Sequence, residues 1–419
     1  MKESNFHYLV NSDKKVFRLI EAEKIRQRDG LEMIASENYV SPAVLEAVGS
    51  ILTNKYAEGY PGHKYYGGCE VIDQIENLAI ERLKKLFGCK FANVQPHCGS
   101  SANMAAYFAI LKPGDRILGQ SLDSGGHLTH GAKVSFSGQL FESMGYGLSA
   151  KTGLLGYDEI AKMAKKFKPQ VIMCGYSAYP RAIDFKKFKK IAKSVGAYLI
   201  ADIAHIAGLV ATGYHPSPIG VADIVTSTTH KTLRGPRSGI IMTNDEELAK
   251  KINKAIFPGI QGGPLEHIIA AKAVAFAEAA KPSFKKYIGK VLENMNAFAK
   301  TLMSYDFDLV TNGTDNHLIL VDLRSKQMTG HDFTEALDKA GITVNKNGVP
   351  GDPLPPMVTS GIRVGTAALT TRGMGVKEMQ RIAEMFNIVA ENMKNSKKLA
   401  EVKKEVVAMT KKFLVPGIK

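Results

Sequence analysis

Tryptophan is absent from this sequence of 419 residues, and only four cysteines are present. The cysteines are Cys69, Cys89, Cys98 and Cys174. They form no Cys-x-x-Cys pair and are too few for a disulfide scaffold, so we expect a reducing cytoplasmic setting. Long apolar runs are also missing, since the best candidate, 197–214, carries Asp202 and His205 in its middle, which excludes a membrane span. Residues 1–15 lack the apolar core of a secretory signal.

Acidic residues are in the minority, with 40 Asp and Glu against 55 Lys and Arg, which gives a net charge of +15. Many lysines lie in segments with helical spacing, such as 184–193 and 397–412, where apolar residues occupy the opposite face. Solvated helix faces account for most of the excess positive charge. Since no recognition motif is present, we expect no nucleic-acid partner.

The hydrophobic pattern predicts alternating helices and strands. Segments 16–27 and 71–87 have helical periodicity, and Gly88 ends the second. Four short apolar or β-branched runs then indicate strands buried on both faces of a mostly parallel sheet flanked by helices. These runs are 171–173, 198–201, 224–226 and 239–242.

The second half of the chain predicts two helices followed by a smaller α/β unit. The helices are expected at 264–280 and 282–303. The smaller unit comprises strands at 308–310 and 317–323, a helix at 330–340 and two final helices from 376. We therefore predict a large domain over residues 1–280, which includes an N-terminal helical arm, and a small C-terminal domain over residues 281–419.

Polar side chains follow two of the predicted central strands, where α/β proteins place their sites. One strand leads into Asp202 and His205, and the next leads into Ser227-Thr228-Thr229-His230-Lys231. Taken alone, Asp202 is more typical of a helix N-cap, and His205 of a core histidine, than of a functional site. Lys231 favours a site, because desolvation at the end of a buried strand lowers the pKa of an amine and makes it a nucleophile for a carbonyl.

An aldehyde cofactor, pyridoxal phosphate, would use all of these groups. Asp202 would pair with the ring nitrogen, Lys231 would bond the aldehyde, and His127 is a candidate to stack on the ring. The small-residue turn 98–101 before a helix predicted at 102–111 would hold the phosphate, although an ordinary helix start has the same pattern. Gly262-Gly263 similarly fits either a phosphate contact or a plain turn. No metal is expected.

Many longer segments match one family in the right order. They are IASENY (34–39), LTNKYAEGYPG (52–62), YYGGCE (65–70), GGHLTHG (125–131), THKTLRGPR (229–237), FPGIQGGP (257–264), GTDNHL (313–318) and SGIRVGT (360–366). Over essentially its whole length the chain resembles serine hydroxymethyltransferase. The resemblance implies a fold type I pyridoxal-phosphate transferase, with a mostly parallel seven-stranded sheet in the large domain and a smaller C-terminal α/β domain.

The resemblance also implies roles for particular residues. Lys231 would carry the cofactor as a Schiff base, Asp202 would pair with the pyridinium nitrogen, and His127 would stack on the ring. The other implied cofactor contacts are Ser177 and His205 near the ring hydroxyl, Gly99 and Ser100 at the phosphate, and Tyr56, Gly262 and Gly263 from a second subunit. The chain would therefore be a homodimer or a tetramer with shared sites.

The implied substrates are serine or glycine and tetrahydrofolate, and the reaction would supply glycine and 5,10-methylenetetrahydrofolate to one-carbon metabolism. Arg363 would clamp the amino-acid carboxylate, because guanidinium geometry suits that group. Ser36 and Tyr66 would assist Arg363, Glu58 would manage a proton near the serine hydroxyl and the folate, and His230 would position Lys231. The residues implied to face the pterin are Leu122, Gly126, Leu128 and Asn347.

Three places depart from the family pattern: Cys98 stands where Ser is usual, Ser101 where Gln or Pro is usual, and Asp123-Ser124 where Ala-His is common. A thiol is a weaker donor than a hydroxyl, so reduced phosphate affinity is the largest effect we expect. Three alternatives remain open at this stage: the same scaffold acting on α-methylserine or as a threonine or allo-threonine aldolase, another fold type I enzyme such as a transaminase, and an RNA-binding role of the basic surface. The matches at Glu58 and Asn347 argue against a transaminase.

Overall fold

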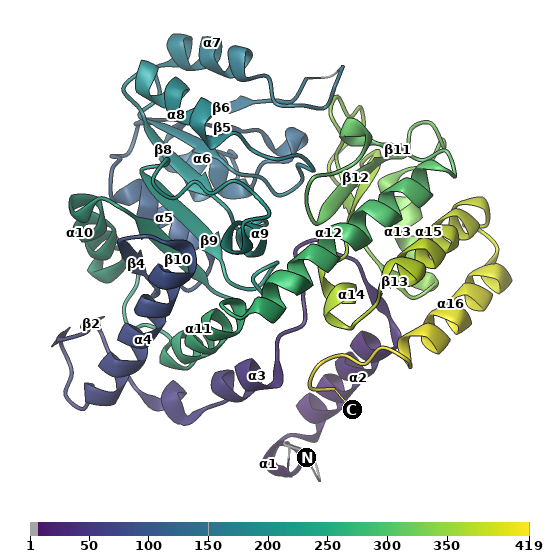
Figure 1. Ribbon diagram of the computed structural model, residues 1–419, viewed down its shortest axis with the longest axis horizontal. Helices are drawn as coiled ribbons and strands as arrows, with labels where there is room; N and C mark the ends of the chain where they lie inside the picture. Colours follow the sequence, from purple (N-terminus) through teal and green to yellow (C-terminus); the bar gives the residue numbers. More distant parts are fainter. Residues whose placement is uncertain (1–6, 150, 419) are drawn as a thin grey trace.

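The computed structural model describes residues 7–149 and 151–418 (Figure 1). Residues 1–6, part of the segment searched for a secretory signal, lie outside the described residues. Among the described helices, none combines the length and apolarity needed to cross a bilayer.

A seven-stranded sheet forms the centre of the larger part of the molecule, in the order β4-β10-β9-β8-β7-β5-β6. The strands are β4 Phe91–Asn93, β5 Arg116–Gln120, β6 Glu142–Tyr146, β7 Val171–Cys174, β8 Tyr198–Asp202, β9 Ile224–Thr228 and β10 Gly239–Thr243. Strands β6, β5, β7, β8 and β9 run parallel to one another, whereas β10 is antiparallel to both β9 and β4. The predicted α/β class and mostly parallel sheet are confirmed.

Helices cover both faces of this sheet, as the buried strand runs require. On one face the core includes Ile172 and Cys174 of β7, and on the other it includes Val171 and Met173 of the same strand. The first face is covered by α4 Glu70–Phe87, α7 Tyr157–Phe167, α8 Phe185–Ser194, α9 Ala207–Thr212 and α11 Glu266–Ala279. The second face is covered by α5 Gly99–Phe108 and α10 Glu246–Lys254.

A second hydrophobic core surrounds a four-stranded antiparallel sheet near the C-terminus. Its strands are β11 Asp308–Leu309, β12 Leu318–Asp322, β15 Gly361–Gly365 and β14 Asn345–Asn347. The helices around it are α12 Pro282–Met303, α13 Gly330–Lys339, α14 Ala367–Thr371, α15 Val376–Glu391 and α16 Ser396–Thr410. The division at residue 280 itself stays a prediction.

The N-terminal segment lies against both parts of the molecule (Figure 1). Strand β1 Leu31–Glu32 pairs in parallel with β13 Ile342–Thr343 of the small unit, and α3 Pro42–Val48 packs on α11. A short hairpin follows, β2 Gly59–Tyr60 with β3 His63–Lys64. The remaining helical elements are α1 His7–Ser12, α2 Lys14–Asp29, η1 Ile51–Asn54, η2 Leu122–Ser124, η3 Leu128–His130, α6 Phe136–Leu140, η4 Ala255–Ile260 and η5 Val310–Asn312.

Helix boundaries follow local chemistry. Gly88 caps α4 in the left-handed region, with φ of 73° and its N–H bonded to the carbonyl of Lys84, as the sequence predicted. Helix α5 begins at Gly99, three residues earlier than the predicted 102. The reason is Cys98, which acts as the N-cap and accepts the N–H of Ala102 on its carbonyl.

Candidate active site

Six of the predicted residues line one small cavity beyond the ends of β8 and β9. They are Gly99, His127, Ser177, Asp202, His205 and Lys231. They come from the start of α5, the loop before η3, the loop after β7, the last residue of β8 and the segments that follow β8 and β9. Parallel strands bring these segments together because their carboxyl ends meet at the same edge of the sheet.

The amine of Lys231 has few partners in this cavity. Its Nζ donates one long hydrogen bond, 3.4 Å, to the hydroxyl of Thr228. Desolvation lowers the pKa of Lys231 to about 8, against the opposing attraction of Asp202. A substantial fraction of the amine is therefore neutral and nucleophilic near pH 7.5, as the sequence argument required.

Asp202 is held rigidly as a carboxylate. Its Oδ2 accepts from Asn103 Nδ2 at 2.9 Å and from His130 Nε2 at 3.2 Å, and its Oδ1 accepts from the N–H of Ala204 at 2.9 Å. Burial alone would raise the pKa of Asp202, but the bonds from His130 and Asn103 hold it well below its usual range. Asp202 is not a helix N-cap, because α9 begins only at Ala207.

Sequence reasoning did not identify Asn103 and His130 as partners of Asp202. His130 lies in the segment GGHLTHG, so the motif contained it, but only the fold joins residues 72 positions apart. Asn103 lies on the first turns of α5 and also accepts from Thr226 at 2.6 Å.

Two histidines present uncharged rings to the cavity. Burial, and then the neighbouring His130, lower the pKa of His127 to about 4, and its Nδ1 accepts the N–H of Thr129 at 3.2 Å. Burial lowers the pKa of His205 well below its usual value. The ring of His205 stacks on His317 from the small unit, with centroids 5.5 Å apart. His317 is a third residue that sequence reasoning missed, although it lies in the matched segment GTDNHL.

The start of α5 offers a place for a phosphate. A Cβ on Gly99 would lie 2.6 Å from Cγ2 of Thr228, so only glycine fits between this turn and the end of β9. The N-terminus of this ten-residue helix, which includes Ser100, favours an anion. Cys98 is exposed, and its Sγ lies 3.1 Å from Oγ of Ser101.

Arg363 is a buried cation without a carboxylate partner in the described part of the chain. Its Nη1 donates to the carbonyl of Ser177 at 2.6 Å, its Nε to Asn345 Oδ1 at 3.2 Å, and its Nη2 to Ser36 Oγ at 3.5 Å. Burial lowers the pKa of Arg363 to about 10. A guanidinium in this state is suited to receive a carboxylate from outside.

His230 precedes Lys231 and lies just behind the cavity. Burial lowers its pKa to about 3, and its Nδ1 accepts the N–H of Ser238 at 3.3 Å. The bond joins the loop of Lys231 to the start of β10, so His230 is placed to support this loop.

A second group of predicted residues lies together but does not line the Lys231 cavity. The hydroxyl of Tyr56 donates to Glu58 Oε1 at 3.1 Å, and the rings of Tyr56 and Tyr66 meet edge to face at 5.1 Å. A Cβ on Gly262 would lie 3.0 Å from Glu58 Oε1, and one on Gly263 would lie 3.3 Å from the ring of Tyr56. The residues predicted to act across a subunit boundary are thus neighbours of one another.

The residues predicted to face a pterin form a third group. Leu122 and Leu128 are exposed, and Asn347 donates to the carbonyl of Gly348. A Cβ on Gly348 would lie 4.0 Å from the carbonyl oxygen of Asp123, so the Asn347 loop passes close to η2. A Cβ on Gly126 would lie only 2.0 Å from the carbonyl oxygen of Gln120, which requires glycine there.

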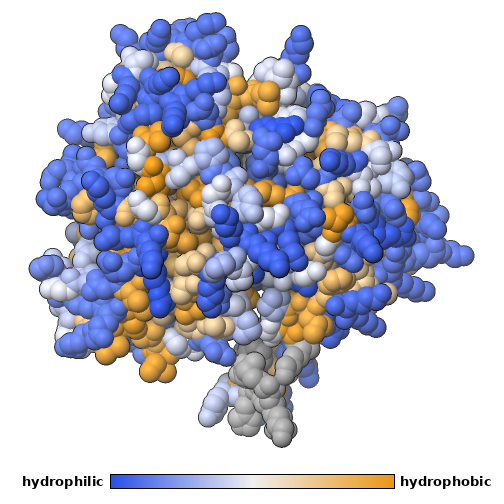
Figure 2. All heavy atoms as spheres, in the orientation of Figure 1, coloured by the Kyte–Doolittle hydropathy of each residue, from blue (hydrophilic) through white to orange (hydrophobic). Residues whose placement is uncertain are grey.

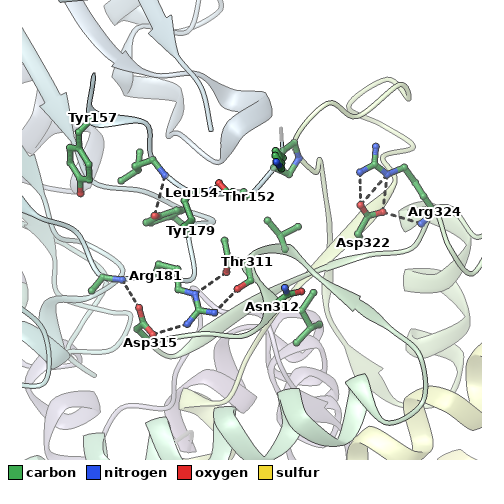
Figure 3. Close-up of a pocket in the computed structure, with 17 residues that line it drawn as sticks. Thr152, Leu154, Tyr157, Tyr179, Arg181, Thr311, Asn312, Asp315, Asp322 and Arg324 are labelled. Atoms are coloured by element: carbon green, nitrogen blue, oxygen red, sulfur yellow. Dashed lines mark hydrogen bonds and ion pairs between the residues drawn. The ribbon is translucent and has the colours of Figure 1, made fainter. Parts of the chain in front are cut away.

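A larger cavity of about 740 Å³ lies between the two parts of the molecule (Figure 3). It is lined by two arginines that already have carboxylate partners: Arg181 bonds Asp315 at 2.8 Å, and Arg324 is paired with Asp322. Arg181 also donates to the carbonyl and the hydroxyl of Thr311, which ties the loop after β7 to the small unit. None of the predicted site residues lines this cavity.

Comparisons with known proteins agree on one family. The family model described as "Serine hydroxymethyltransferase" matches residues 9–386. A protein of Wolinella succinogenes named serine hydroxymethyltransferase is 58% identical over 407 residues, which are 97% of this chain and 98% of the relative. A protein of the same name from Nitratiruptor sp. is 57% identical, with 97% and 98% covered, and one from Rickettsia canadensis is 57% identical, with 95% of each chain covered.

Proposed function

The chain belongs to the serine hydroxymethyltransferase family, and on that premise we propose that the residues around Lys231 bind its cofactor and amino acid. Its activity is the reversible transfer of the hydroxymethyl carbon of serine to tetrahydrofolate, giving glycine and 5,10-methylenetetrahydrofolate. The names of the relatives favour this reaction over the α-methylserine and aldolase alternatives. Enzymes of this family use pyridoxal phosphate.

The residues at the cavity fit pyridoxal phosphate. A carboxylate held ionised, an amine with a lowered pKa, an uncharged imidazole and a helix N-terminus are the groups that this cofactor requires. When bound, the cofactor supplies a ring that draws electrons from the substrate carbon. Asp202 would hold the proton on the ring nitrogen, and Lys231 would bond the aldehyde. Gly99 and Ser100 would bind the phosphate, while Ser177 and His205 would lie near the ring hydroxyl.

The observation that carries the amino-acid site is Arg363, a buried guanidinium without an acidic partner among the described residues. It would bind the carboxylate of serine and hold its Cα near Lys231. Ser36, which accepts from Nη2 of Arg363, would assist it.

The other two groups of residues would bind folate and complete the site of a second subunit. We propose that Leu122, Gly126, Leu128 and Asn347 face the pterin. Tyr56, Glu58, Tyr66, Gly262 and Gly263 would complete the site of a second copy of the chain, where Glu58 handles the proton of the serine hydroxyl.

Two observations support a homodimer with shared sites. The Glu58 group is separate from the Lys231 cavity, so one chain alone leaves the site incomplete. Exposed apolar side chains also gather near the loop of Glu58, where Figure 2 shows hydrophobic residues over α3, α4 and α11. These side chains include Leu45, Ile51, Val71 and Leu78.

We also propose a cytoplasmic location. All four cysteines are free, which is consistent with a reducing compartment.

Serine turnover by the purified protein tests the proposed function. We expect production of 5,10-methylenetetrahydrofolate from serine that depends on both pyridoxal phosphate and tetrahydrofolate. Turnover of α-methylserine in preference to serine, or cleavage of allo-threonine with no folate-dependent reaction of serine, would contradict the proposal. Shared sites are tested by mixing Lys231→Ala and Glu58→Gln subunits: hybrid dimers should turn over serine much faster than either variant alone.

A further inference from the structure

A buried cluster of charged side chains lies directly beneath the loop that carries Glu58. Its central pair is Lys64 of β3 and Glu76 of α4, whose side chains are only 3% and 1% exposed and whose Nζ and Oε2 atoms are 2.7 Å apart. Neither residue belongs to the groups that bind cofactor, amino acid or folate. A buried ion pair is weak evidence for a stabilising role, because its desolvation cost offsets its attraction.

The ammonium of Lys64 holds the backbone on both sides of Glu58. It donates to the carbonyl of Ala57 at 3.2 Å and to the carbonyl of Gly59 at 3.3 Å. The carbonyl of Glu58 itself accepts the N–H of Tyr65 at 2.9 Å. The carbonyls of three successive residues, Ala57, Glu58 and Gly59, are therefore hydrogen-bonded, and Lys64 donates to two of them.

Gln95 completes the arrangement from the central sheet. Its Nε2 donates to the carbonyl of Gly59 at 2.9 Å and to Glu76 Oε1 at 2.7 Å. Glu76 thus uses one oxygen for Lys64 and the other for Gln95. Through these two donors, α4 and the end of β4 determine where the loop of Glu58 lies.

Glu266 provides an internal comparison within the same cluster. Its side chain is fully buried and lies 3.8 Å from Nζ of Lys64, yet neither of its oxygens has a hydrogen-bond partner. Lys272, the other buried cation nearby, donates instead to backbone carbonyls, including that of Gly239 at 2.9 Å. Burial raises the pKa of Glu266 to about 8, so this carboxyl is mostly protonated at pH 7.

We propose that the Lys64–Glu76 pair is a positioning device that holds Glu58 in the orientation in which it acts on the hydroxymethyl group. This inference rests on the proposed function of Glu58 and adds how the chain places that carboxylate. Lys64 and Glu76 act through the backbone of the loop and do not touch the substrates.

The test uses the holoenzyme and removes both members of the pair together. The double variant Lys64→Met/Glu76→Leu removes both charges of the pair together, so neither partner is left buried without the other, and it is expected to fold. Glu266→Gln is the matched control, because it changes a buried carboxyl of the same cluster that holds no hydrogen bond. Each change is made with Glu58 and again in a Glu58→Gln background.

Three quantities are measured: folate-dependent serine turnover, exchange of the glycine α-hydrogen with deuterated water, and amide exchange of the peptide that contains residues 56–66. Glycine exchange involves no hydroxymethyl group and does not need the proton transfer assigned to Glu58. The double variant should lower serine turnover about tenfold to 100-fold, as a small displacement of a catalytic group does. It should leave glycine exchange within about twofold and make the amide of Tyr65 exchange faster. Glu266→Gln should change none of the three.

The Glu58→Gln background separates positioning from general support. If the pair acts through Glu58, the double variant should lower turnover little further in that background. An equal loss in both backgrounds, or a parallel loss of glycine exchange, would overturn the inference and assign the pair a structural role. If Glu58→Gln itself leaves serine turnover unchanged, the proposed role of Glu58 fails first, and the inference is overturned with it.

Discussion

Replacing Arg363 with methionine should separate substrate binding from stability more clearly than any other change at the site. Arg363 is 9% exposed and has no acidic partner among the described residues. Methionine has a similar length and fills the same space without charge. The substitution should therefore weaken serine binding strongly but change the unfolding free energy of the serine-free protein little.

The expected changes in unfolding free energy and in serine affinity follow from the surroundings of the guanidinium. Burial lowers the pKa of Arg363 from 12.5 to about 10, which corresponds to about 3 kcal/mol against the charged form. The hydrogen bonds to Ser177 and Asn345 return a similar amount, at about 1.5 kcal/mol or more each. The unfolding free energy without serine should thus change by only about 1 kcal/mol in either direction. Loss of a buried, bidentate partner should cost about 2–5 kcal/mol of serine binding, or about 30-fold to several thousand-fold in Kd.

Calorimetric titration of the holoenzyme with serine and denaturant unfolding without serine measure the two quantities, at one fixed protein concentration. Arg181→Met is the matched control, since Arg181 is paired with Asp315 and does not line the Lys231 cavity. It should lower stability by about 1–2 kcal/mol and leave serine affinity unchanged. An Arg363→Met protein that binds serine normally but has lost about 3 kcal/mol or more of stability would refute the reasoning.

Three further predictions concern the cofactor groups. The rate at which the apoenzyme bonds pyridoxal phosphate should rise with pH around a midpoint of about 8, the pKa of Lys231, and a midpoint of that rate near 10.5 would contradict the assignment. Because burial disfavours the charged amine, the free energy of unfolding should also rise from about pH 8 towards 10.5 relative to Lys231→Met. Asn103→Leu removes one of two donors to Asp202 Oδ2 and should weaken cofactor binding about tenfold by fluorescence titration, whereas an unchanged Kd would argue against Asp202 as the partner of the ring nitrogen. Cys98→Ser should tighten cofactor binding about threefold to tenfold, since a hydroxyl donates better than a thiol; an unchanged Kd would show that this departure does not matter.

Local patterns in the sequence predicted much of the fold. The apolar runs of β7, β8 and β9 indicated buried parallel strands, and Gly88 indicated the end of α4, because each of these signals depends on neighbouring residues. The antiparallel pairing of β10 with β4 was not predicted. It joins Ile241 to Asn93 across more than a hundred residues, and no local periodicity reports such a pairing.

In the candidate site, too, residues with a local sequence signal were predicted, and residues joined only by the tertiary structure were not. Lys231 and Asp202 were identified because each follows a buried strand, and the matched segments added Arg363. Their supporting partners were missed, because Asn103 meets Asp202 only through packing of α5 on the sheet. The Lys64–Glu76 pair was missed for a similar reason: charged residues on a hairpin and a helix normally indicate solvent, and only the tertiary structure buries them.

The most direct test of the central claim is to locate the lysine that bonds the cofactor. Borohydride treatment of the protein with pyridoxal phosphate fixes that bond, and peptide mass spectrometry then identifies the modified residue. We predict one phosphopyridoxyl group per chain, on Lys231. Modification of another lysine, such as the buried Lys272, or no modification at all, would contradict the account.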